Sequence, residues 1–142
     1  MLTLLEPREF VFIAEFETNT TRVQLDEQGI MHVFFKADED VVMEDILVMH
    51  EWKSQQLKGG RHFNVTTPEY GSTVDSAVRE WGRSDERTVS IGADALVVRT
   101  LAHKLLVNFY MKYNKPEHPT KVFSDEQSAV EWLLELKSAA ED

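Results

Sequence analysis

The polar residues of this chain that could bind a charged group gather near residue 110. Asn108 and Lys112 are four residues apart, so on a helix they share one face, and Lys115 follows closely. An amide and an ammonium at this spacing could receive an anion or the carboxylate of a partner protein. Alternatively, Asn108 bonds to a loop backbone, and Lys112 stabilises the C-terminal end of the helix, where a cation is favoured.

Two tyrosines on the same segment suggest a different chemistry, the binding of an apolar molecule. Tyr110 and Tyr113 follow Leu106 at helical spacing. They could line a pocket between this helix and a sheet, whereas Leu105 and Phe109 are expected in the core. Ordinary core packing together with a self-association surface would account for the same aromatic residues.

The histidines and glycines do not have the spacing of a metal site or of a catalytic motif. The histidines are His32, His50, His62, His103 and His118. No two of them stand at a short ligand spacing, and there is no His-Glu-x-x-His. There is no Gly-x-Ser-x-Gly, and Gly59-Gly60 ends a predicted helix instead of opening one as a phosphate loop would. We therefore expect no metal, no cofactor and no enzyme activity.

The composition predicts a single cytoplasmic domain that does not bind nucleic acid. The chain has 142 residues and no cysteine, which excludes disulfides, thiolate zinc sites and cysteine nucleophiles. Its formal net charge is −10, whereas nucleic acids and anionic lipids bind surfaces rich in lysine and arginine. No segment approaches the roughly 18 apolar residues of a membrane-spanning helix. The first residues also lack the features of a secretion signal. No membrane insertion is expected.

Apolar periodicity predicts an α/β fold with a mixed sheet and helices packed against it. Strands are expected at 10–16, 21–26, 30–35, 63–68, 93–98 and 121–123. Helices are expected at 42–57, from a cap at Ser72 or Thr73 to Trp81, at 101–113 and from 124 onward, with a further turn from Ser84. The order is β-β-α-β-α-β-α-β-α, preceded by an extra N-terminal strand. A hairpin followed by repeated strand–helix units implies a mixed sheet.

Five segments carry a resemblance to a known family. They are Gly29-Ile30-Met31-His32-Val33, Leu106-Val107-Asn108-Phe109-Tyr110-Met111-Lys112, Asn114-Lys115-Pro116, Pro119-Thr120-Lys121-Val122-Phe123 and Ala129-Val130-Glu131-Trp132-Leu133. Together they resemble a bacterial family of STAS-like proteins of unknown function. The order of elements is also that of STAS domains, the fold of anti-sigma factor antagonists and sulfate-transporter tails. We therefore divide the chain into an N-terminal extension, 1–20, and a STAS-like domain, 21–142.

The resemblance implies a regulatory site at the start of the second helix. Anti-sigma factor antagonists are phosphorylated there on serine or threonine and dock a partner, which would place the switch at Ser72, Thr73 or Ser76. A phosphate at a helix N-terminus meets free amides and the positive end of the dipole. Alternatively, Ser72 or Thr73 is only a helix cap. The Asp-Ser-Ser signature of the antagonists is missing, since the preceding strand ends in Val65-Thr66-Thr67.

We therefore expect a STAS-like module that regulates by binding a protein partner and does not catalyse a reaction. It could form a homodimer through the apolar leading strand and the wide apolar face of the helix at 101–113. The alternative is a carrier or sensor of a small apolar, lipid-like ligand, because related folds are associated with such ligands. The candidate surface for a partner or a ligand consists of Asn108, Tyr110, Lys112 and Tyr113.

Overall fold

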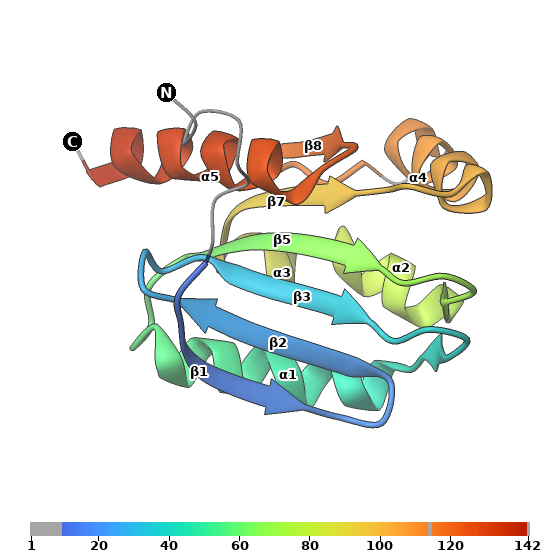
Figure 1. Ribbon diagram of the computed structural model, residues 1–142, viewed down its shortest axis with the longest axis horizontal. Coiled ribbons are helices and arrows are strands. Elements are labelled where there is room, and N and C mark those ends of the chain that lie inside the picture. Colours follow the sequence, from blue (N-terminus) through green and yellow to red (C-terminus); the bar gives the residue numbers. More distant parts are fainter. Residues whose placement is uncertain (1–9, 114, 142) are drawn as a thin grey trace, which may run out of the picture.

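Residues that alternate in polarity build the sheet, and apolar residues at helical spacing build the layers on its two faces. The computed structural model describes residues 10–113 and 115–141. Within them, six strands form one sheet in the order β1-β2-β3-β5-β7-β8, with helices packed against it (Figure 1). These strands are β1 (Phe12–Glu17), β2 (Thr21–Asp26), β3 (Met31–Phe35), β5 (His62–Pro68), β7 (Ile91–Val97) and β8 (Thr120–Phe123). The helices are α1 (Met43–Gln56), α2 (Ser76–Gly82), α3 (Asp85–Thr88), α4 (Leu101–Tyr113) and α5 (Glu126–Glu141).

The sheet is antiparallel at one end and parallel at the other. β1, β2 and β3 pair antiparallel, whereas β3, β5, β7 and β8 pair parallel. The expected α/β fold with a mixed sheet and an extra N-terminal strand is confirmed. That strand, β1, forms the edge of the sheet beside β2. The first nine residues of the predicted extension lie outside the described residues.

Two hydrophobic cores lie on opposite faces of the sheet, because successive side chains of a strand point to opposite sides. One core joins β5 and β7 to α5 and consists of Ile30, Phe63, Val65, Ala93, Ala95, Val97, Ala129, Val130 and Leu133. The other joins β2 and β3 to α1 and α2 and consists of Val23, Leu25, Met31, Val33, Val41, Ile46, Met49 and Val78. The residues of β5 and β7 that alternate with the first core therefore turn toward the side of α1 and α2.

The cap of the second predicted helix is wrong by two or three residues, because the observed cap is Asp75. Ser72 and Thr73 do not cap it, because Thr73 begins β6 (Thr73–Val74), which pairs in parallel with β4 (Asp40–Val41). The helix α2 begins at Ser76, and the side chain of Asp75 accepts a hydrogen bond from the amide of Ala77. Because Thr73 and Val74 are paired in a strand, their backbone is extended and α2 begins only after them.

The apolar residues of α4 are largely exposed, so their expected place in the core is wrong. Leu105 is 61% exposed and Phe109 is 56% exposed. His103 is the buried residue of this helix. The face of the sheet toward α5 is already covered, and α4 lies beyond the end of β7 (Figure 1). Although α4 is apolar, neither it nor any other helix in the described ranges is long and apolar enough to cross a membrane.

A fully buried histidine joins the β2–β3 hairpin to α5. Its ring lies between two carboxylates: Nε2 of His32 is 2.8 Å from Asp26 Oδ2, and Nδ1 is 2.8 Å from Glu126 Oε1. Asp26 also closes the hairpin turn, since its Oδ1 accepts from the amides of Gln28 and Ile30. Burial alone would lower the pKa of His32, but the hydrogen bonds and charges of Asp26 and Glu126 raise it. The imidazolium, which can donate from both nitrogens, is therefore more favoured in the folded chain than in the unfolded chain.

We expect Glu126→Gln to lower the free energy of unfolding by about 1–2 kcal/mol near pH 6. The folded state holds a proton on His32 that the unfolded chain releases above its ordinary pKa of about 6.5, so this stabilisation falls as the pH rises through the raised pKa. Urea unfolding near pH 6 and near pH 9 measures the difference between variant and wild type. Glu135→Gln, at an exposed position of α5, is the control. An equal effect of Glu126→Gln at both pH values would contradict the charged form.

Candidate functional site

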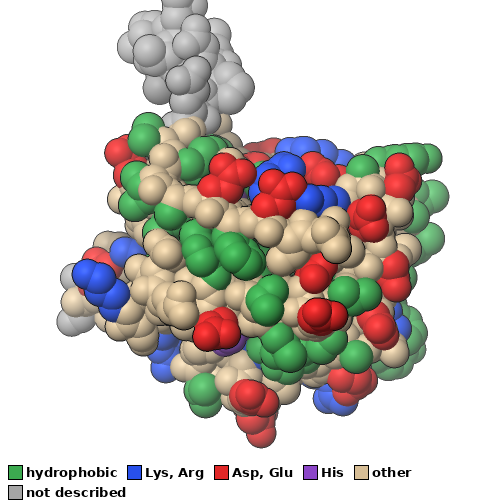
Figure 2. All heavy atoms as spheres, turned by 90° about the horizontal axis from the view of Figure 1, so that it is seen from below, with side chains coloured by type: hydrophobic (Ala, Val, Ile, Leu, Met, Phe, Trp, Pro, Cys, Tyr) green, Lys and Arg blue, Asp and Glu red, His purple; other side chains and the backbone are tan. Residues whose placement is uncertain are grey.

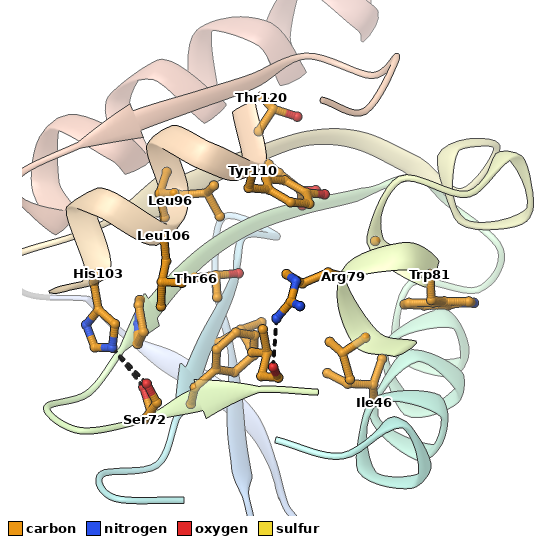
Figure 3. Close-up of a pocket in the computed structure, with 18 of the residues that line it drawn as sticks. Ile46, Thr66, Ser72, Arg79, Trp81, Leu96, His103, Leu106, Tyr110 and Thr120 are labelled. Atoms are coloured by element: carbon orange, nitrogen blue, oxygen red, sulfur yellow. Dashed lines mark hydrogen bonds between the residues drawn. The ribbon is translucent and has the colours of Figure 1, made fainter. Parts of the chain in front are cut away.

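A pocket of about 360 Å³ opens on the face of the sheet opposite α5. Its floor is formed by side chains of β3, β5 and β7, and its walls come from α1, α2 and α4. Figure 3 shows Leu106 and Tyr110 reaching from α4, and Arg79 from α2, toward the same space. The apolar lining residues are Val33, Phe35, Ile46, Met49, Pro68, Val74, Val78, Trp81, Leu96, Val98, Leu106 and Val107. Most of the pocket surface is therefore suited to an apolar molecule.

One part of the lining is polar and consists of a chain of hydrogen bonds that joins α1, β5, β7, α3 and the segment before β8. The Nζ of Lys53 donates to Asn64 Oδ1 at 3.2 Å, and Asn64 Nδ2 donates to Asp94 Oδ1 at 3.0 Å. Asp94 accepts two bonds from the guanidinium of Arg87, at 2.6 and 3.0 Å. It also accepts a bond from His118 Nε2 at 2.7 Å. Lys53, Arg87 and Asp94 line the pocket.

Not every charged group in this chain of hydrogen bonds has an oppositely charged partner of its own. Burial would raise the pKa of Asp94, but Arg87 and His118 hold it well below its usual range, so the carboxylate is charged. Lys53 is 3% exposed, and burial together with the charge of Arg87 lowers its pKa to about 7, with Asp94 opposing the shift. Burial also raises the pKa of Tyr110 to about 12, which keeps its hydroxyl protonated. Lys53 is thus a buried amine that is only partly protonated near neutral pH, and the nearby carboxylate of Asp94 is already bound to Arg87.

Two neutral histidines, His50 and His62, lie close enough to Lys53 to be affected by its charge, and His50 lines the pocket. Burial and the charge of Lys53 lower the pKa of His50 to about 4 and that of His62 to about 3. The two rings lie 4.8 Å apart, and the ring of His50 meets Trp81 edge-on at 5.0 Å. These histidines therefore serve as uncharged packing groups near neutral pH. Among the described residues, no group of histidine, aspartate and glutamate side chains has the arrangement of a metal site.

The structure separates the four residues predicted as a ligand or partner surface. Tyr110 lines the pocket. Asn108, Lys112 and Tyr113 lie exposed on α4, where the Tyr113 ring packs against Phe109 with centroids 4.7 Å apart. The predicted pair of Asn108 and Lys112 thus faces away from the polar groups of the pocket.

The three residues predicted as a switch have different surroundings. Ser72 is buried, and its carbonyl accepts a hydrogen bond from His103 Nε2 at 2.9 Å (Figure 3). Thr73 is exposed and donates to Asp40 Oδ1 at 2.7 Å. Ser76 is exposed at the first position of α2, beside the Asp75 carboxylate. Ser72 and Thr73 line the pocket together with Tyr110. Phosphorylation at these positions stays a prediction.

The polar chain of the pocket was missed by the sequence analysis, although a signal for it exists. Lys53 continues the buried stripe of Ile46 and Met49 at intervals of three and four residues. Asn64 and Asp94 interrupt the apolar runs of two central strands. A polar residue in a buried stripe or strand needs a partner inside the fold, and that requirement could have singled out these positions.

The comparisons with known proteins found a family and no individual relative. A family model described as a domain of unknown function (DUF7793) matches residues 24–137, which is most of the chain. The matched part includes every residue of the polar chain from Lys53 to His118. The comparison with curated proteins and that with solved structures gave no match.

We expect Asp94→Asn to lower the free energy of unfolding by about 3–5 kcal/mol, because the change leaves the nearly buried Arg87 without its counter-charge. Urea unfolding near neutral pH measures this loss. Glu131→Gln, which neutralises an exposed carboxylate on α5, is the control and should change the free energy by less than about 0.5 kcal/mol. If Asp94→Asn were as mild as the control, the ion pair would not hold this part of the fold together.

Proposed function

The chain belongs to the DUF7793 family of domains of unknown function, and we propose that it binds one small, largely apolar organic molecule in this pocket without catalysing a reaction. The observation that carries the proposal is the pocket of about 360 Å³ with mostly apolar walls and a few polar groups. Ligand sites of proteins commonly have volumes of about 300–1,000 Å³ and this kind of lining, so the pocket suits a small ligand. This is the carrier or sensor function that was the alternative expectation from the sequence.

The hydrogen bonds and the pKa of Asp94 argue against its use as a catalytic base. Asp94 is the carboxylate of the lining, and Asn64, Arg87 and His118 already bind its oxygens. A general base needs a free oxygen within reach of the substrate and a pKa near the working pH, and Asp94 has neither. The STAS-like relationship and the cytoplasmic location remain parts of this proposal.

The helix α4 closes one side of the pocket and is anchored near its start by a buried histidine. His103, its buried residue, bonds to the carbonyl of Ser72. Leu106 and Tyr110 line the pocket from the same helix. A ligand that contacts these two side chains would hold α4 against the sheet. Binding should therefore stabilise the folded chain.

We expect Leu96→Trp to weaken ligand binding about tenfold or more, which corresponds to at least about 1.4 kcal/mol. Leu96 projects from β7 into the pocket, and an indole there would occupy ligand space (Figure 3). The probe is N-phenyl-1-naphthylamine, an uncharged dye that fluoresces in apolar surroundings, and native mass spectrometry reports any ligand that co-purifies. Leu105→Trp, at an exposed position of α4 outside the pocket, is the matched control.

Wild type and Leu105→Trp should bind one dye molecule per chain with equal affinity. The proposal fails if the wild type binds neither dye nor a co-purifying molecule, or if Leu96→Trp binds the dye as tightly as wild type does.

The exposed side of α4 supports a second function, the protein binding that was first expected from the sequence. Leu101, Leu105, Phe109 and Tyr113 follow at four-residue spacing and are 73%, 61%, 56% and 60% exposed. Residues at this spacing form one row along a helix. Lys104 and Lys112 are exposed on the same helix, which contains no acidic residue. We propose that this row binds an apolar protein segment with acidic flanks.

A homodimer that uses both the leading strand and α4 requires a reciprocal contact between these two surfaces. β1 is at one edge of the sheet, whereas α4 follows β7 near the other edge (Figure 1). One two-fold axis would then bring β1 of each copy against α4 of the other. Self-association through α4 alone remains a testable outcome.

We expect Leu105→Glu to abolish binding to a synthetic amphipathic peptide with leucines on one side and glutamates on its flanks. The new carboxylate breaks the apolar row and repels the acidic flanks. Fluorescence anisotropy measures binding, and Val89→Glu is the control, since Val89 is an exposed apolar residue outside α4. A lysine-flanked peptide that binds equally well would contradict the acidic partner. A dimer mass in light scattering that is lost in Leu105→Glu would replace that partner with a second copy.

A further inference from the structure

We propose that the ligand of the pocket carries a carboxylate and that this group binds the ammonium of Lys53. The inference rests on the proposed ligand-binding function and adds the chemical class of the ligand: a small organic acid with an apolar body. Three independent observations support it, namely the hydrogen bonding of Lys53, the charges of the pocket lining, and the apolar walls around them.

The ammonium of Lys53 has more hydrogen-bonding capacity than the described residues use. It carries three N–H donors, and the side-chain bond recorded for it runs to the amide oxygen of Asn64. No carboxylate of a described residue forms a salt bridge with it. Asp94 lies nearby, but its two oxygens accept from Arg87, His118 and Asn64. A buried cation without its own carboxylate is costly, and a ligand carboxylate would remove that cost.

The pocket lining is cationic in a chain that is otherwise acidic. Lys53, Arg79 and Arg87 line the pocket with a single carboxylate, Asp94, although the formal net charge of the chain is −10. Arg79 donates to a neutral group, the carbonyl of Val74 (Figure 3). Acidic side chains are spread over the outer face in Figure 2. An anion is therefore favoured inside the pocket compared with the outer surface.

The surroundings of Lys53 favour a singly charged carboxylate over a phosphate. A phosphate dianion needs several strong donors. Arg87 is already committed to Asp94, so Lys53 is the main free donor at this end. Beyond it the walls are apolar, with Ile46, Met49 and Leu96 among the lining residues. One charge at the end of an apolar body matches this arrangement.

Binding of a carboxylate should also take up a proton. The titratable groups that act on Lys53 are Arg87 of α3 and Asp94 of β7, and Lys53 in turn acts on His50 of α1 and His62 of β5. The pKa of Lys53 is lowered to about 7, while both histidines have pKa values below 5. A carboxylate beside Lys53 would raise its pKa. At about pH 8, an amine that is mostly neutral in the free protein would therefore become protonated in the complex.

The experiment compares octanoate with 1-octanol by isothermal titration calorimetry. These molecules share an apolar chain and differ in the charged group. The wild type should bind octanoate about tenfold or more tightly than octanol. Lys53→Met should remove this preference and leave octanol binding unchanged or stronger, because methionine has an unbranched side chain only one atom shorter than that of lysine and carries no charge. Lys104→Met, at an exposed position of α4, is the control and should retain the preference.

The same titrations in two buffers with different heats of protonation measure proton uptake. Octanoate should draw a proton into the wild-type complex at about pH 8, and this uptake should vanish in Lys53→Met. Urea unfolding shows whether that variant is folded. If it is not, Lys53→Gln serves instead, since its amide still offers N–H donors to Asn64 without a charge.

Equal affinities of wild type for octanoate and octanol would overturn the inference and leave the proposed ligand binding intact. A preference for octanoate that persists in both Lys53 variants would overturn the assignment to Lys53. If neither compound binds, displacement of the neutral dye separates the two proposals. A dye that binds but is not displaced by octanoate overturns this inference alone, whereas absence of any dye binding removes the proposed function as well.

Discussion

The carboxylate of Asp94 is the interaction on which the pocket depends. It lies in the central strand β7 and accepts hydrogen bonds from β5, from α3 and from the segment before β8. Arg87 also donates to the carbonyl of Gly82 at the end of α2. At that glycine a Cβ atom would lie 3.0 Å from the hydroxyl of Tyr110 on α4. The buried carboxylate of Asp94 thus holds α3 and the end of α2 in place, and with them the space beside α4. Removing one partner of a buried ion pair is strongly destabilising, because it leaves the other charge buried and uncompensated.

The buried Lys53 lowers the stability of the folded chain, and this cost is understandable if the residue is part of a binding site. An apolar side chain at position 53 would continue the stripe of Ile46 and Met49 and would fill the same space without a desolvation cost. Lysine instead brings an ammonium whose pKa is lowered to about 7 by burial. Natural proteins depart from the most stable choice chiefly at functional sites, so the cost of Lys53 argues for a role in binding.

The sequence predicts the sheet and most of the helices because these depend on local periodicity. The apolar run in β7 and the spacing in α5 can be read directly, and both elements occur where expected. The start of α2 could not be predicted in this way, because Thr73 pairs with Asp40, far away in the chain. The polar part of the pocket was also out of reach, since Lys53, Arg87 and Asp94 come from three different elements. In the sequence, this part of the pocket is indicated only by polar residues that interrupt buried apolar stripes and strands. These residues identify single positions, but they do not show which side chains contact each other in the fold.

The helix α4 shows why an apolar pattern predicts a surface but not its partner. Its leucines repeat as they would in a core helix, yet Leu101 and Leu105 are exposed while Leu106 and Tyr110 line the pocket. One helix therefore presents one row to the proposed ligand and another to the proposed protein partner. A ligand that holds α4 against the sheet would also orient the outer row. By thermodynamic linkage, a partner bound to that row would then tighten ligand binding by the same factor.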